Sequence, residues 1–74
     1  MITTTKSATF MGTKKNLDMF IACGIKYASE IKYNRDFTAV KIVWICENEN
    51  HDIHDDIDLE EMEKWNIEIL SINN

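Results

Sequence analysis

This 74-residue chain has no proline and only two glycines, Gly12 and Gly24. It therefore lacks a Pro- or Gly-rich linker at which two domains could separate, and its length suits one domain. We expect a single domain over residues 1–74. Hydrophobic residues make up 45% of the chain and charged residues 28%, a composition typical of globular rather than disordered proteins.

Cysteine and long apolar runs are also scarce. The two cysteines, Cys23 and Cys46, stand in apolar surroundings, which favours two reduced, buried thiols in an intracellular protein. The apolar stretch Met19–Ile25 is far shorter than the ~20 residues needed to cross a bilayer. No secretion signal is visible. We therefore expect a cytoplasmic protein without membrane partners, in the host cytoplasm if a phage encodes it.

Negative charge is abundant, and it is concentrated at one end. Residues 1–45 carry seven Lys/Arg against three Asp/Glu, a net charge of +4. Residues 46–74 carry ten Asp/Glu against Lys64 alone, a net charge of −9. Such a block repels itself, so we expect it to face water or a basic partner. The same charge disfavours direct binding of nucleic acid, because phosphate contacts need an excess of Lys/Arg.

The first half of the chain predicts a strand followed by a long helix. Alternating and β-branched residues over Ile2–Met11 favour a strand, with Lys6 on its wetter face. Gly12 ends that strand, and Thr13 is a good N-cap for a helix over Lys14–Tyr33. The apolar face of this helix recurs at three- and four-residue steps, at Leu17, Phe20, Ile21, Gly24, Ala28 and Ile31.

The second half predicts strand, loop, helix and strand. Phe37–Cys46 is apolar on both faces, which indicates a central strand. The polar stretch Glu47–Ile57 is expected to be a loop. Asp58–Trp65 forms a short helix, in which Glu61 stands where a capping-box partner of the first residue belongs. Ile67–Ile72 alternates as a last strand.

The element order β-α-β-α-β predicts an α/β fold, with α+β as the alternative. We expect a small three-stranded parallel or mixed sheet with right-handed crossovers and both helices mainly on one face. The other sheet face would then be partly bare, which favours a homodimer or a protein partner. Gly24, within the apolar helix face, predicts that a strand or a second helix comes close there.

The acidic segment Glu47–Trp65 is the leading functional candidate. Its carboxylates can stand in for phosphates in a basic groove of a DNA- or RNA-handling protein, with Met62 or Trp65 as an apolar anchor. We predict a non-enzymatic, cofactor-free binding protein that docks this segment on a larger protein. A phage or mobile-element inhibitor of a host nuclease or regulator fits this description. The alternative without a binding role is that the charges only keep this surface solvated. The predicted contact residues are Glu47, Glu49, Asp52, Asp55, Asp56, Asp58, Glu60, Glu61, Met62 and Trp65.

A metal-binding protein is an alternative, because thiolate and imidazole are metal ligands and Cys46, His51 and His54 lie close in sequence. Cys46 with a histidine and a neighbouring aspartate also has the residue types of a nucleophile and its base, although no complete catalytic motif is present. The same stretch matches a calcium loop imperfectly, because Ile57 stands where the sharp turn needs glycine.

A third possibility is a small-ligand site between the first strand and the first helix. Backbone N–H groups at a helix start attract anions, and two lysines would reinforce them. The residues concerned are Gly12, Thr13, Lys14 and Lys15. Because the full phosphate-binding motif is absent, this stretch predicts at most a weak anion or nucleotide-phosphate contact.

Overall fold

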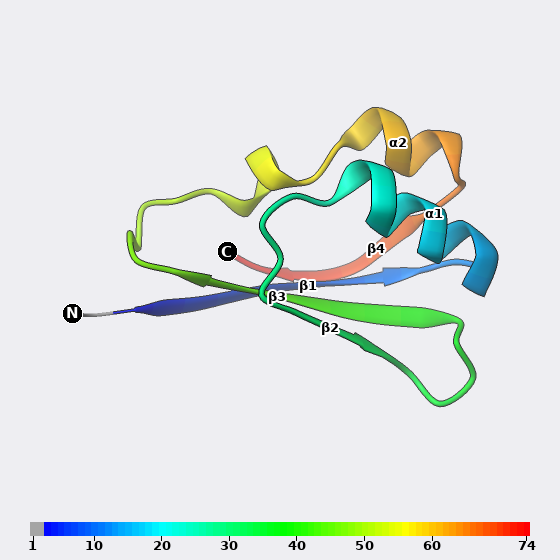
Figure 1. Cartoon of the computed structure of the whole chain (residues 1–74), viewed down its shortest axis with the longest axis horizontal. Helices are drawn as coiled ribbons and strands as arrows, with labels where there is room; N and C mark the ends of the chain where they lie inside the picture. Colours follow the sequence, from blue (N-terminus) through cyan, green and yellow to red (C-terminus); the bar gives the residue numbers. More distant parts are fainter. Residues whose placement is uncertain (1–2) are drawn as a thin grey trace.

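The computed structural model describes residues 3–74 as a four-stranded antiparallel sheet with helices on one face (Figure 1). The strands run in the order β2-β3-β1-β4, and each hydrogen-bonded pair is antiparallel. The elements in chain order are β1 (Thr4–Met11), α1 (Lys14–Gly24), β2 (Glu30–Tyr33), β3 (Ala39–Cys46), the 3-10 helix η1 (Ile53–Asp56), α2 (Leu59–Lys64) and β4 (Glu68–Asn73).

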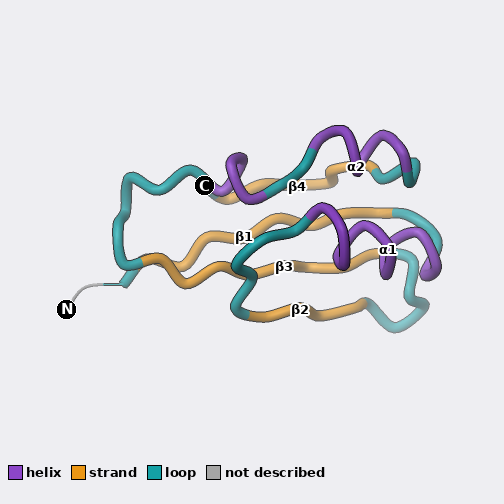
Figure 2. Tube along the Cα trace, turned by 45° about the horizontal axis from the view of Figure 1, so that its top comes forward, coloured by secondary structure: helices purple, strands orange, loops and turns teal. Residues whose placement is uncertain are grey.

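The predicted three-stranded parallel or mixed α/β sheet is therefore wrong, and the fold is α+β. Strands that run in the same direction are never neighbours, because β3 separates β1 from β2 and β1 separates β3 from β4. This connectivity consists of two interlocked split β-α-β units, as in ferredoxin-like folds. Figure 2 shows both helices above the same side of the sheet. Ile2, the first residue of the predicted strand, lies outside the described residues.

The error arises from the predicted helix Lys14–Tyr33, which ends at Gly24. Ile25 already has extended backbone angles, and Tyr27 has a positive φ of 61° that no α-helix contains. The remaining residues form β2, which pairs with β3. Of the predicted apolar face, Ala28 in the segment before β2 still packs against the core, whereas Ile31 in β2 is 42% exposed.

The core lies between the sheet and α1. Thr13 caps α1 as predicted, accepting a hydrogen bond from the Asn16 backbone N–H at 3.2 Å. Leu17 and Phe20 of α1 are fully buried, and Phe20 packs edge-to-face on Phe10 of β1 with ring centroids 5.1 Å apart. Burial of each such side chain stabilises the fold by about 1.5–3 kcal/mol. No helix within residues 3–74 is long and apolar enough to cross a bilayer.

The central position predicted for the strand at Phe37–Cys46 is confirmed, since β3 lies between β2 and β1. Val40, Ile42 and Trp44 are buried on the side of the helices. On the other face of the strand Val43 is almost covered, whereas Ile45 is exposed. Apolar residues on both faces therefore correctly indicated a strand with neighbours on either side.

Two predicted placements are wrong and two are confirmed. Lys6 is only 5% exposed, because it pairs in register with Trp44 and shares the helix-facing side of β1 with Ala8 and Phe10. Cys23 is exposed on α1, whereas Cys46 is buried as predicted. A Cβ atom added at Gly24 would lie 2.9 Å from the Cβ of Glu61 in α2, so the predicted close approach of a second helix is correct.

Candidate functional site

The segment between β3 and β4 carries seven exposed carboxylates, which we call the acidic surface. It follows the loop after β3, continues over η1 and ends on α2 (Figure 1). Its members are Glu47, Glu49, Asp52, Asp55, Asp58, Glu60 and Glu63. Asp56 and Glu61, which also belong to the predicted contact set, are not part of the acidic surface, because Asp56 is buried and Glu61 is half-buried.

Helix α2 is organised by its own acidic residues. Asp58 is the N-cap, and its carboxylate accepts hydrogen bonds from the backbone N–H groups of Glu60 at 2.9 Å and Glu61 at 3.2 Å. Glu61 does not complete a capping box: its carboxylate accepts a hydrogen bond from the Trp65 indole at 2.8 Å. Trp65 and Met62 are half-buried and pack against the core, so neither is the freely exposed anchor that the sequence suggested.

A buried lysine fixes the loop that begins the acidic surface. The Lys6 ammonium group, from β1, donates hydrogen bonds to the backbone carbonyl of Glu49 at 2.9 Å and to that of His51. A buried charge is costly unless hydrogen bonds replace its hydration, and these two carbonyls supply that replacement. Lys6 thereby connects the loop to the sheet, whereas the side chain of Glu49 stays in solvent.

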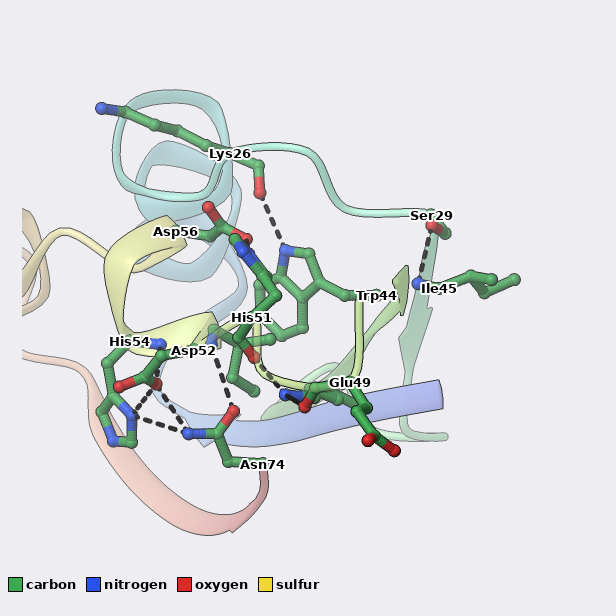
Figure 3. A network of polar contacts seen from close by, with 12 residues as sticks. Lys26, Ser29, Trp44, Ile45, Glu49, His51, Asp52, His54, Asp56 and Asn74 are labelled. Atoms are coloured by element: carbon green, nitrogen blue, oxygen red, sulfur yellow. Dashed lines mark hydrogen bonds and ion pairs between the residues drawn. The ribbon is translucent and has the colours of Figure 1, made fainter. Parts of the chain in front are cut away.

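Two histidine–aspartate pairs hold the next part of the chain (Figure 3). His51 Nε2 lies 2.7 Å from Oδ2 of the buried Asp56. His54 Nδ1 lies 2.7 Å from Oδ1 of the exposed Asp52. The two imidazoles therefore face different carboxylates and do not converge on a common point.

Asp52 also ties the end of the chain to the start of η1. Its carboxylate accepts hydrogen bonds from the His54 backbone N–H at 2.9 Å and from the Asn74 side chain at 2.6 Å. Asn74 in turn accepts from the Ile53 backbone N–H at 3.2 Å. The His54 backbone donor, followed by the His54 ring and Asn74, lowers the pKa of Asp52 to about 2. Asp52 is therefore charged at every pH from neutral down to mildly acidic.

The metal alternative finds no geometric support. Within residues 3–74, no three His, Cys, Asp or Glu side chains are arranged to hold a metal ion. His51 and His54 are each paired with their own aspartate, and Cys46 is 9% exposed at the end of β3. In the calcium-loop alternative, Asp56 is buried against His51 and Asp58 caps α2, so these two carboxylates are engaged elsewhere.

The residues of the predicted anion site are mostly engaged in structural contacts. The Gly12 N–H donates to the Thr38 carbonyl at 3.0 Å, and the Thr13 hydroxyl caps α1. Lys14 bridges Asp18 at 2.9 Å, which lowers the pKa of Asp18 together with a hydrogen bond from Tyr33. Lys15 is exposed at the start of α1. A turn, a helix cap and an ion pair thus account for most of this stretch.

A cleft opens at the end of β3, between the α1–β2 connection and the loop that Lys6 holds. We call it the β3-end cleft; its volume is about 520 Å³. Its walls come from the α1–β2 connection, from β3 and the loop that follows, and from η1. The lining residues are Tyr27, Trp44, Ile45, Cys46, Glu47, Asn48, His51 and Asp56.

Tyr27 lines this cleft and was not among the residues that the sequence indicated for any site. It is 85% exposed, and its φ of 61° places it in the left-handed region. For a bulky residue this conformation is unusual and costs on the order of 1–3 kcal/mol. Trp44 helps to impose it, because its indole donates a hydrogen bond at 2.8 Å to the carbonyl of the preceding Lys26 (Figure 3). The sequence carries no signal for this arrangement, since it depends on contacts distant along the chain.

No protein-family model, no curated protein and no solved structure matches this chain in comparisons with known proteins. The connectivity of the fold hosts many unrelated functions and so does not select one. The function must therefore be argued from the acidic surface and the β3-end cleft themselves.

Proposed function

We propose that this chain is a non-enzymatic binding protein whose acidic surface docks onto a basic surface of a larger protein. One observation carries the proposal: seven carboxylates stay exposed on a segment whose backbone is fixed by the buried Lys6 and the His51–Asp56 pair. The charges are thus presented on a pre-arranged scaffold, so that little conformational freedom is lost on binding.

The partner class follows from the charge pattern. An array of carboxylates along one segment resembles the phosphates of a nucleic-acid strand, and it attracts a surface rich in Lys and Arg by long-range steering. We therefore infer a nucleic-acid-binding protein as the partner and nucleic-acid mimicry as the mode of inhibition. A phage or mobile-element inhibitor that acts in the host cytoplasm remains the biological setting we propose.

We propose Leu59 and Tyr27, instead of Met62 and Trp65, as the apolar side chains that contact the partner. Leu59 is 58% exposed and lines a hollow together with Lys26, Asp55, Asp58 and Glu60. Tyr27 follows Lys26 directly and is 85% exposed. Exposed apolar side chains next to charged ones are typical of interface anchors, because association removes their apolar surface from water.

Direct nucleic-acid binding is disfavoured by the open face of the sheet. Single-stranded RNA binders of this connectivity stack bases on aromatic side chains of the two central strands. Here the strand register places Ser7 and Thr9 of β1 opposite Val43 and Lys41 of β3 on that face, and none of these is aromatic. Ile45 and Met11 are exposed on the same face.

The homodimer predicted from a bare sheet face stays a prediction. Sedimentation at several protein concentrations would test it.

The test compares two triple variants that remove the same charge from different places. The first, Asp55→Asn with Glu60→Gln and Glu63→Gln, neutralises exposed members of the acidic surface and spares the Asp58 cap and the Asp56 pair. The second, Glu30→Gln with Asp36→Asn and Glu68→Gln, neutralises three exposed carboxylates outside it. Each raises the net charge by three.

Immobilised wild-type protein should retain a basic, nucleic-acid-binding protein at low ionic strength and release it as salt rises. Heparin, a polyanion, should compete for the same partner. The triple variant of the acidic surface should lose this retention, and the control triple variant should keep it. Equal retention by both variants would reject the proposal.

A further inference from the structure

We propose that the β3-end cleft receives a single arginine side chain of the docked partner. This inference rests on the proposed function and names the group that the partner presents. The cleft is large enough for such a side chain, at about 520 Å³, and adjoins the acidic surface through Glu47. Pockets of this kind hold a partner's anchoring side chain in many interfaces.

The walls of the cleft are fixed before any partner arrives. Trp44 holds the carbonyl of Lys26, and the Ser29 hydroxyl accepts a hydrogen bond from the Ile45 backbone N–H at 3.1 Å. In the loop after β3, Lys6 holds the carbonyls of Glu49 and His51. A pre-formed cleft binds with less ordering than a mobile one.

The chemistry of the lining favours a cation on an apolar stem. Trp44, Ile45 and Cys46 supply apolar surface from β3, whereas no Lys or Arg of residues 3–74 lines the cleft. Of its two carboxylates, Asp56 is already paired with His51. The carboxylate of Glu47 is exposed and takes part in no hydrogen bond or ion pair within the described chain, so it is available to an incoming cation.

The exposed ring of Tyr27 favours an arginine over a lysine side chain in the cleft. Tyr27 is 85% exposed beside the cleft, where a planar guanidinium can stack on its ring. A guanidinium is more weakly hydrated than an ammonium, and it can donate two parallel hydrogen bonds to one carboxylate while it stacks. The combination of an exposed aromatic ring with a free carboxylate, over an apolar floor, thus suits arginine best.

The test is an NMR titration with short peptides that differ in one side chain. The probe is acetyl-Gly-Gly-Arg-Gly-Gly-amide, and its matched controls carry citrulline or lysine in place of arginine. The arginine peptide should shift the Trp44 indole signal and the backbone amides of Tyr27 and Glu47 in a saturable way. The neutral citrulline peptide should bind about tenfold more weakly, because the charge-assisted hydrogen bonds are lost.

Matched variants separate the cleft from the acidic surface as a whole. Glu47→Gln should weaken the arginine peptide about tenfold, whereas Glu60→Gln, which removes the same charge outside the cleft, should change its affinity less than about twofold. Tyr27→Phe should retain binding and Tyr27→Ala should lose it. Tyr27 is exposed, so neither substitution is expected to unfold the chain.

Three results would overturn the inference. These are equal affinity for the arginine and citrulline peptides, equal losses in Glu47→Gln and Glu60→Gln, and the absence of any shift at the Trp44 indole. Each leaves the proposed function intact, because that proposal is judged by variants at Asp55, Glu60 and Glu63 with a protein partner. Failure of those variants to lose the partner, in contrast, would reject both.

Discussion

The two β-α-β units of this fold are held in different ways. Helix α1 buries Leu17, Phe20 and Gly24, whereas the six-residue α2 has no buried residue. The unit around α2 relies on the buried Lys6, the His51–Asp56 pair and the contacts of Asp52, along with isoleucines in its connections. A segment crowded with carboxylates has few side chains to bury, so a few polar contacts fix its position.

The largest expected effect on stability comes from a pair of large-to-small substitutions, one in each unit. Phe20→Ala removes a fully buried ring that packs on Phe10, and it should lower the free energy of unfolding by about 3–5 kcal/mol. Met62→Ala in α2 removes a half-buried side chain and should cost only about 1 kcal/mol. Urea unfolding followed by circular dichroism measures both.

Phe20→Leu provides a milder variant should Phe20→Ala fail to fold, since it retains most of the buried volume. It should still cost more than Met62→Ala. If Met62→Ala costs as much as the Phe20 variants, α2 is held by apolar packing after all and the contrast between the two units fails.

Sequence patterns identified elements where local chemistry and final packing agree. Thr13 and Asp58 cap their helices as predicted, and the two-faced apolar pattern of β3 marked a central strand. β2 was missed because Ala28 and Ile31 continue the helical spacing of α1, although the backbone leaves the helix at Ile25 and turns at Tyr27. That turn is imposed by tertiary contacts, which no local pattern records.

Lys6 was misplaced for a different reason, and here the sequence did contain the signal. Strand alternation places Lys6 on the same side as Ala8 and Phe10, and its charge alone argued for water. The β3-end cleft carried no such signal, because its walls come from segments on both sides of β3 and from η1. Its residues were predicted only in part: Glu47 and Asp56 as members of the contact set, and Cys46 and His51 as members of the metal alternative.

The next test removes the connection between the two units. Lys6→Met keeps the length of the side chain but leaves the carbonyls of Glu49 and His51 without their donor. We expect a loss of about 1–3 kcal/mol in the free energy of unfolding. Amide hydrogen exchange should quicken in the loop after β3 and stay slow in α1, because the loss is local to the unit around α2.

Lys41→Met is the matched control, since Lys41 is exposed on the open face of the sheet. It should change stability by less than about 0.5 kcal/mol. If Lys6→Met instead stabilises the chain, the cost of burying the ammonium group exceeds the worth of its hydrogen bonds, and the polar contact does not hold the loop.

The smallest expected effect is a pH dependence at the junction between η1 and the chain end. Hydrogen bonds from His54 and Asn74 lower the pKa of Asp52 from 3.8 to about 2 in the folded state. A lowered folded-state pKa stabilises the fold fully above the unfolded value, and this contribution disappears as pH falls through the folded value. The stability advantage of wild type over Asp52→Asn should therefore be constant near neutrality and shrink between pH 4 and pH 2.

Chemical unfolding of both proteins at a series of pH values measures this advantage. Because Asp52 is exposed, solvent screens its interactions and the effect should be well below that of Lys6→Met. Asn74→Ala removes one of the donors to Asp52 and should reproduce only part of the loss, with the backbone donor of His54 still in place. An advantage that persists unchanged down to pH 2 would mean that Asp52 holds η1 by hydrogen bonds that do not depend on its charge. The unit around α2 would then be fixed by shape as much as by electrostatics.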